Sequence, residues 1–169
     1  IGNLNSIGGP IRTEASGTSA VKMEFSPLVP VARQNRILTI HYTKGDGPAR
    51  WVTRVAQDMR KFSHLEFRVR GEVGGESFTI DLVDLKGRRT SLSIEDSLRG
   101  GATKSWETVR IPVEQFRLSL LSPGLPERMA EDLAFSFDEG SGTIYLDDVK
   151  LIFREWTLNN YWDVLISGP

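Results

Sequence analysis

Apolar and polar residues alternate with a period of two along most of the chain, and almost nowhere do apolar residues recur at helical spacing. The alternating segments are short, rich in β-branched and aromatic residues, and separated by clusters of Gly, Pro, Asp, Asn or Ser. We therefore predict strands at 20–25, 37–42, 51–56, 65–69, 78–82, 90–94, 108–111, 133–137 and 144–153. Many short strands at such regular spacing are typical of an all-β sandwich or barrel.

Turn-forming residues separate the predicted strands. Residues 44–48 carry Gly, Asp and Pro and should not stay extended, whereas 72–75 and 86–88 should form hairpins whose flanking strands pair antiparallel. The only helical candidate is 126–132, one or two turns in the connection that follows Phe116. Since 169 residues without an internal repeat, linker or low-complexity tract are the length of one compact unit, we predict a single core.

The last predicted strand changes its apolar side halfway along. Ile144 and Leu146 share one parity, whereas Val149 has the other, so the change falls at Asp147 and Asp148. A β-bulge, or a change of the sheet that the strand faces, would reconcile the two halves. Adjacent carboxylates in an apolar strand are costly unless they are exposed, hydrogen-bonded or bound to a cation. The pair therefore indicates either a charged sheet edge or a site for a hard cation such as calcium.

Composition excludes several classes of function. The formal net charge of −1 gives no basic face for nucleic acid, and the absence of cysteine removes thiol catalysis, disulfides and cysteine-ligated zinc. No segment approaches the roughly 20 apolar residues of a membrane span. His41 and His64 are the only imidazoles, and both fall at strand ends, where we interpret them as solvated or hydrogen-bonded edge residues rather than as bases.

Local signatures of catalysis are also missing from the sequence. There is no Glu-x-Asp-x-x-Glu strand of a sandwich glycosidase, no Gly-x-Ser-x-Gly elbow and no His-Glu-x-x-His helix. The segment 45–47, Gly-Asp-Gly, is too short and too close to Pro48 to cradle a phosphate group. We therefore predict that the chain is not an enzyme.

The remaining candidate chemistry is that of a surface for hydroxylated ligands. Sugars stack their apolar faces on aromatic rings and exchange hydrogen bonds with charged and amide side chains. We interpret Trp51 as such a platform, on the solvent-facing side of its strand and opposite Val52, whereas Trp106 next to an apolar strand is interpreted as core packing. The full set of candidate sugar-binding residues is Trp51, Tyr42, Arg50, Arg68, Arg70, Asp81 and Asp84.

Three blocks in a fixed order resemble a known superfamily. They are Trp-Val at 51–52 followed by KFSHLEFRVRG at 61–71, SWETVRIPVEQF at 105–116, and GTIYLDDVKL at 142–151. Order and spacing over about residues 3–153 resemble the galactose-binding-like carbohydrate-binding modules, nearest to the family 11 modules and the CIA30-like domains. The early Gly8-Gly9 is similar to the CIA30-like domains, for which the implied role is association with proteins.

The resemblance implies a two-sheet antiparallel β-sandwich of the jelly-roll type, with a ligand groove on its concave sheet and a structural Ca²⁺. Asp147 matches the family's carboxylate ligand for that calcium. The sequence departs from the family's pattern in two places. The acidic block of the family's first strand would lie before Ile1. The segment after Phe116 offers only Arg117 toward the groove.

We therefore predict a non-catalytic carbohydrate-binding module for a polysaccharide or oligosaccharide, of the β-glucan type, within a larger secreted or periplasmic glycan-active protein. The alternative is a protein-interaction or assembly module of the CIA30-like kind on the same fold. We assign residues 1–155 to the sandwich and 156–169 to a C-terminal extension, which is either an extra strand, a cover for the sandwich or a tether to the next domain.

Overall fold

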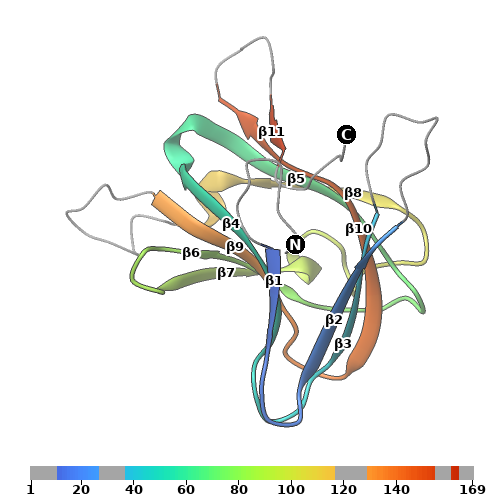
Figure 1. The fold of residues 1–169 in the computed structure, drawn as a ribbon. Coiled ribbons are helices and arrows are strands. Elements are labelled where there is room, and N and C mark those ends of the chain that lie inside the picture. Colours follow the sequence, from blue (N-terminus) through green and yellow to red (C-terminus); the bar gives the residue numbers. More distant parts are fainter. Residues whose placement is uncertain (1–10, 27–36, 117–128, 155–160, 164–169) are drawn as a thin grey trace.

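Two antiparallel sheets pack face to face in the computed structural model, which describes residues 11–26, 37–116, 129–154 and 161–163 (Figure 1). One sheet has five strands in the order β1 (Ile11–Ala15), β4 (Ala49–Asp58), β9 (Met129–Ser136), β6 (Thr79–Val83) and β7 (Arg89–Ser93). The other has six, in the order β2 (Ala20–Phe25), β3 (Leu38–Thr43), β10 (Ser141–Phe153), β5 (Phe62–Gly71) and β8 (Glu107–Pro112), with β11 (Tyr161–Asp163) beside β10. The predicted all-β sandwich is confirmed.

Short 3₁₀ helices occupy some of the connections: η1 (Met59–Lys61), η2 (Ile94–Asp96) and η3 (Val113–Phe116). No helix in the described part of the chain has the length and apolar character needed to cross a membrane.

The core lies between the two sheets and is centred on Phe135 of β9. Its ring lies 5.5 Å from that of Trp51 in β4, 5.2 Å from that of Phe67 in β5 and 5.0 Å from that of Phe78, measured between centroids. All four side chains are at most 2% exposed. Because Phe67 belongs to the six-stranded sheet and Trp51 to the five-stranded one, this aromatic cluster joins the two layers.

The predicted strands agree with those observed apart from their ends, with three exceptions. β1 was not predicted, because its IRTEA sequence contains a single apolar β-former and no sustained alternation. β11 lies in the C-terminal extension and is the extra strand that was one of the alternatives for that segment. The helical prediction at 126–132 is wrong for 129–132, which belong to β9, because pairing with β4 overrides the helix preference of Met, Ala and Glu; its first residues lie outside the described part.

The turn at 72–75 does not join paired strands as predicted. β5 pairs with β8 and β10, whereas β6 pairs with β7 and β9, so the chain crosses from one sheet to the other between them. Gly74 and Gly75 take positive φ of 95° and 93° as the chain leaves β5. Beyond them Phe78 enters the core from the opposite side. The hairpin at 86–88 is confirmed, because β6 and β7 do pair.

The bulge predicted in the last strand is confirmed. The register between β10 and β5 shifts between Asp147 and Lys150, and Asp148 takes a positive φ of 50°. The extra residue lets Leu146 and Val149 both face the core, each at 0% exposure. Asp147 consequently lies on the outer face of the six-stranded sheet.

Candidate functional site

Two aromatic rings and two arginines form a cluster on the outer face of the six-stranded sheet. The guanidinium carbon of Arg70 lies 3.8 Å from the ring centroid of Tyr145 and 5.5 Å from that of Trp106. The guanidinium carbon of Arg68 lies 5.1 Å from the same Trp106 ring, and its Nη1 lies 3.4 Å from Oδ2 of Asp147. We call these five residues the aromatic–arginine cluster. All except Asp147, which is 9% exposed, are half-buried, so rings and guanidinium groups reach solvent.

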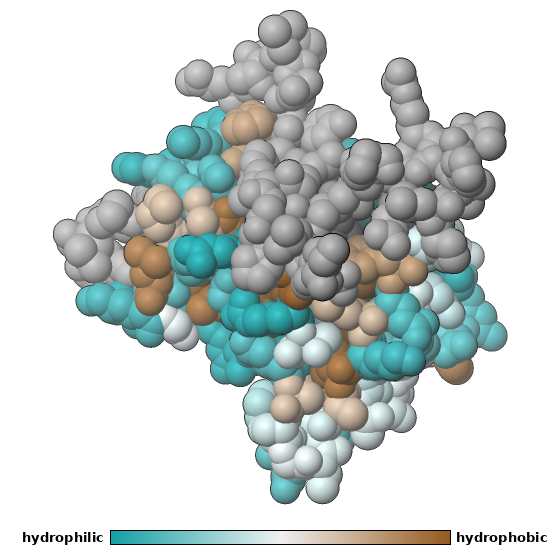
Figure 2. Space-filling model, in the orientation of Figure 1, coloured by the Kyte–Doolittle hydropathy of each residue, from teal (hydrophilic) through white to brown (hydrophobic). Residues whose placement is uncertain are grey.

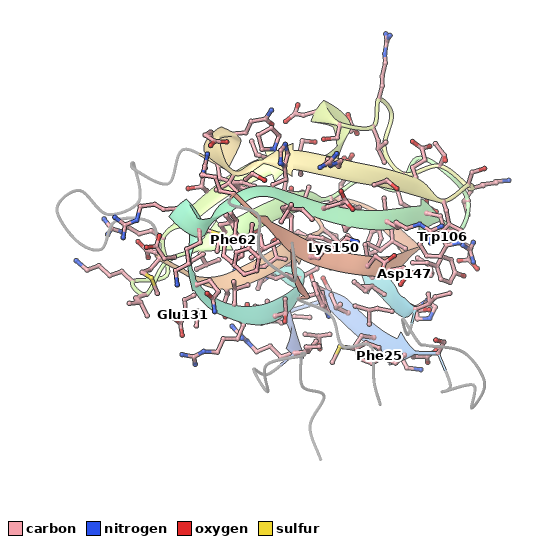
Figure 3. The ribbon with its side chains drawn as sticks, turned by 90° about the horizontal axis from the view of Figure 1, so that it is seen from above. Phe25, Phe62, Trp106, Glu131, Asp147 and Lys150 are labelled. Atoms are coloured by element: carbon pink, nitrogen blue, oxygen red, sulfur yellow. The ribbon has the colours of Figure 1, made fainter. Side chains whose placement is uncertain are left out.

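Strand register brings the cluster together from distant parts of the sequence. Tyr145 of β10 stands directly opposite Arg70 of β5, and Asp147 stands opposite Arg68. On the other side of β5, Arg68 faces Thr108 of β8, and Trp106 precedes β8 with the same parity as Thr108. Because alternate side chains point to the same face of a strand, all of these side chains project outward. Figure 3 looks onto this sheet and shows Trp106 and Asp147 near one end, with Lys150 farther along β10.

Charged pairs continue along the sheet beside the cluster. Glu66 of β5 binds Nε of Arg110 at 2.9 Å and Nζ of Lys150 at 3.6 Å. On β2, Lys22 pairs with Glu24 at 2.7 Å, and Glu24 lies 3.9 Å from Nε2 of His41.

These pairs make a polar surface on both sides of the aromatic rings. Among the described residues, only Val73 and Leu85 are large apolar side chains that are clearly exposed, each at 70%. Figure 2 shows the same character from another side, where hydrophobic residues form small separate groups in a mainly hydrophilic surface. The molecule therefore presents rings between polar groups, rather than a broad apolar patch, to a ligand.

Asp147 is the carboxylate of the cluster and is 9% exposed. Burial raises its pKa above the ordinary value, and the neighbouring Asp148 carboxylate raises it further. The Asp148 backbone N–H, which donates to Oδ1 of Asp147 at 2.8 Å, acts in the opposite direction together with Arg68 and Lys150. The net effect is an acid that holds its proton more tightly than a free aspartate.

The residues around Asp147 do not fit the calcium site implied by the resemblance. One carboxylate oxygen already accepts the Asp148 N–H, and the other faces the Arg68 guanidinium, which repels a cation. The described residues contain no group of three or more His, Cys, Asp or Glu side chains arranged to hold a metal ion.

The two aromatic residues predicted as sugar platforms lie in the core, and that prediction is wrong. Trp51 is 0% exposed, belongs to the core between the sheets and packs on Phe135 of the neighbouring strand β9. Tyr42 is 5% exposed and stacks on Phe137 at 3.9 Å between centroids. Trp51 and Val52 are both buried, so apolar character alone did not show which of them points into the core.

The predicted polar residues are divided among three places. Arg50 and Asp81 lie on the outer face of the five-stranded sheet, where Arg50 pairs with Glu14 at 3.3 Å. Asp81 is 1% exposed and accepts a hydrogen bond from the Ser136 hydroxyl at 2.5 Å. Asp84 stabilises the 84–88 turn, where it accepts hydrogen bonds from backbone N–H groups. Arg50 and Asp81 are both close to Ser136, because Ser136 stands opposite Arg50 and donates to Asp81, whereas Arg68 and Arg70 belong to the cluster.

Trp106 and Tyr145 were missed, although the sequence carries a signal for each. Tyr145 falls between Ile144 and Leu146, so the parity that places those two in the core places Tyr145 outside. Trp106 has the parity of Arg110 and not that of Val109. Its interpretation as core packing is wrong, because nearness to an apolar strand says nothing about which side of the strand a residue takes.

Comparison with protein families and solved structures adds a separate line of evidence. The model of the family described as carbohydrate binding domain 30 matches residues 32–153. A comparison with curated proteins gives no match.

Three solved structures share the fold. The family 11 carbohydrate-binding module of the cellulosomal cellulase Lic26A-Cel5E of Clostridium thermocellum is 20% identical with a TM-score of 0.64, covering 94% of this chain and 93% of that one. A family 11 module from Clostridium thermocellum in complex with a β-1,3-1,4-mixed-linked tetrasaccharide is 18% identical with a TM-score of 0.59, covering 85% and 88%. A β-1,2-glucanase from Parabacteroides distasonis is 19% identical with a TM-score of 0.63, covering 86% of this chain and 23% of that one.

Proposed function

Since the chain belongs to the carbohydrate binding domain 30 family, we propose that it binds a β-linked glucan, without catalysis, on the aromatic–arginine cluster of the six-stranded sheet. The observation that carries this proposal is the position of two half-buried rings, Trp106 and Tyr145, on either side of Arg70. Pyranose rings stack on such aromatic side chains, and guanidinium N–H groups donate to sugar hydroxyls.

The solved structures support the choice of ligand and of context. The family 11 module that shares this fold is in complex with a β-1,3-1,4-mixed-linked tetrasaccharide, and this makes mixed-linkage β-glucan the first ligand to test. The β-1,2-glucanase contains a region of this fold within a much longer chain. By analogy we propose that this chain is one module of a larger glycan-active protein that acts outside the cytoplasm.

Binding should be weak, because the cluster lies on an open sheet face. Stacking and a few hydrogen bonds of that kind correspond to a Kd on the order of 10 µM to 1 mM. Affinity electrophoresis in gels that contain mixed-linkage β-glucan detects interactions in this range. We expect the wild-type protein to be retarded and Tyr145→Ala to lose most of the retardation, since it removes one ring and the support of Arg70.

A matched control comes from the opposite sheet. Arg54 lies on the outer face of the five-stranded sheet with 49% of its side chain exposed, close to the 41% of Arg68. Arg54→Ala should therefore leave retardation unchanged, whereas Arg68→Ala should weaken it. Equal effects of Arg54→Ala and Arg68→Ala would contradict the assignment of the face. A folded wild-type protein that no polysaccharide retains would favour the protein-association role instead.

A further inference from the structure

Among the described residues, Arg70 differs from the other cations of the outer face because it has no acidic partner there. Arg68 pairs with Asp147, Lys22 pairs with Glu24, and Arg110 shares Glu66 with Lys150. The described residues place no carboxylate within ion-pair distance of Arg70, whose recorded neighbours are the rings of Tyr145 and Trp106. Within the part of the chain that the structure describes, no carboxylate therefore compensates the charge of Arg70.

The surroundings of Arg70 increase the strength of an interaction with an anion. The guanidinium lies 3.8 Å from the Tyr145 ring centroid, so the ring excludes water from one side and holds the group in place. A guanidinium that is held in this way keeps its N–H groups aimed sideways, in the planar geometry that matches both oxygens of a carboxylate. A neutral hydroxyl uses only part of this geometry and none of the charge.

The neighbouring pair Arg68–Asp147 does not offset this preference. Oδ2 of Asp147 accepts from Arg68 and its Oδ1 accepts the Asp148 N–H, so both carboxylate oxygens already have a donor other than Arg70. On the adjacent strand β5, Glu66 is engaged by both Arg110 and Lys150. Asp147 and Glu66 are thus each paired with a cation of the same face.

We propose that the preferred ligand carries carboxylate groups, and that Arg70 binds the carboxylate of a uronic acid unit whose ring stacks on Trp106 or Tyr145. This inference rests on the proposed function, because it assigns a chemical class of sugar to the same face. The net charge of −1 does not indicate this site, because the net charge sums all residues of the chain and the site depends on the local charge of Arg70.

The experiment compares polymers that differ only at C6 of the sugar. Mixed-linkage β-glucan and the same polymer with its primary hydroxyls oxidised to carboxylates are titrated into the protein by isothermal calorimetry at low and high salt. We expect the oxidised polymer to bind about tenfold more tightly at low salt, as a charge-assisted bidentate contact predicts. High salt should reduce this advantage but leave the affinity for the neutral polymer almost unchanged.

Variants separate the specific contact from general charge attraction. Arg70→Ala should remove the preference for the oxidised polymer, Arg70→Lys should retain only part of it, and Arg54→Ala on the other sheet should retain all of it. Polyglutamate, a polyanion without sugar rings, should not bind. Equal affinity for the two glucans, a preference that survives Arg70→Ala, or binding of polyglutamate would overturn the inference. Equal affinity can arise in two ways. If the protein binds both glucans equally well, only the inference about carboxylates fails and the proposed function stands. If it binds neither glucan, the proposed function itself is contradicted.

Discussion

Two tryptophans show how local packing decides the role of a residue. Trp51 lies within β4 and Trp106 just before β8, yet the first fills the core and the second lies on the outer face. The parity of Trp106 with Arg110 already indicates its side of the strand, whereas Trp51 and Val52 are both apolar and both buried, so parity alone does not decide which of them faces the core. The outward side of Arg68 and Arg70 could be predicted, because charged side chains that alternate with Phe67 and Val69 have only the solvent side available to them.

Replacing Trp51 tests its place in the core. Trp51→Ala should lower the free energy of unfolding by about 3–5 kcal/mol, because it leaves a large cavity next to Phe135. Trp51→Phe should cost less, since it keeps part of the volume and removes an indole N–H that has no hydrogen-bond partner among the described residues. Urea denaturation of both variants measures the difference. A stable Trp51→Ala protein with impaired glucan binding would restore Trp51 as a platform.

Asp147 makes stability depend on pH in a defined direction. Its pKa in the folded protein is raised above the ordinary 3.8, so its contribution to stability is fully present below that value and is lost as pH rises through the folded pKa. Asp147→Asn should therefore be at least as stable as the wild type at pH 7, with the difference shrinking below pH 3.8. Melting temperatures between pH 3 and pH 7 check this. An Asn variant that is less stable at pH 7 would show that the ion pair with Arg68 outweighs burial.

At the scale of elements, most strands and the bulge in β10 follow from alternation, because a bulge is visible wherever the apolar parity changes within one strand. Pairing does not follow in the same way. The 72–75 segment has the residues of a hairpin turn, but β5 and β6 lie in different sheets because Phe78 must be buried from the opposite side. The grouping of Tyr145 with Trp106 depends on this pairing, and for that reason the centre of the candidate site could not be predicted.

Two variants test the bulge: one deletes its extra residue, and the other keeps the residue but changes its side chain. Deleting Asp148 should lower the free energy of unfolding by at least about 3 kcal/mol, since Val149 and Leu151 would then face away from the core. Asp148→Gly should change it by less than about 1 kcal/mol, because glycine adopts the observed φ of 50° without strain. Chemical denaturation of both variants gives the comparison. Equal effects of the deletion and the substitution would mean that β10 tolerates a shift of register.

At the scale of the whole molecule, stability arises from two sheets that share one aromatic core. Phe135 contacts rings from both layers, and Tyr42 and Phe137 extend the contact toward the ends of β3 and β9. Because the outer-face cluster is separate from the core, we expect its residues to be replaceable without unfolding the domain.

The last test asks whether Asp147 holds a calcium ion, and it measures the melting temperature with calcium removed. An ion that binds only the folded protein, present at 100 times its Kd, adds about 2.7 kcal/mol to stability, so a chelator should then lower the melting temperature by several degrees. Because the carboxylate of Asp147 is engaged by Arg68 and by the Asp148 N–H, we expect the melting temperature to be the same in excess chelator and in excess calcium. A rise with calcium that Asp147→Asn abolishes would place an ion at Asp147 and contradict this expectation. A rise that survives Asp147→Asn would locate the ion elsewhere in the chain and leave Asp147 as a partner of Arg68 alone.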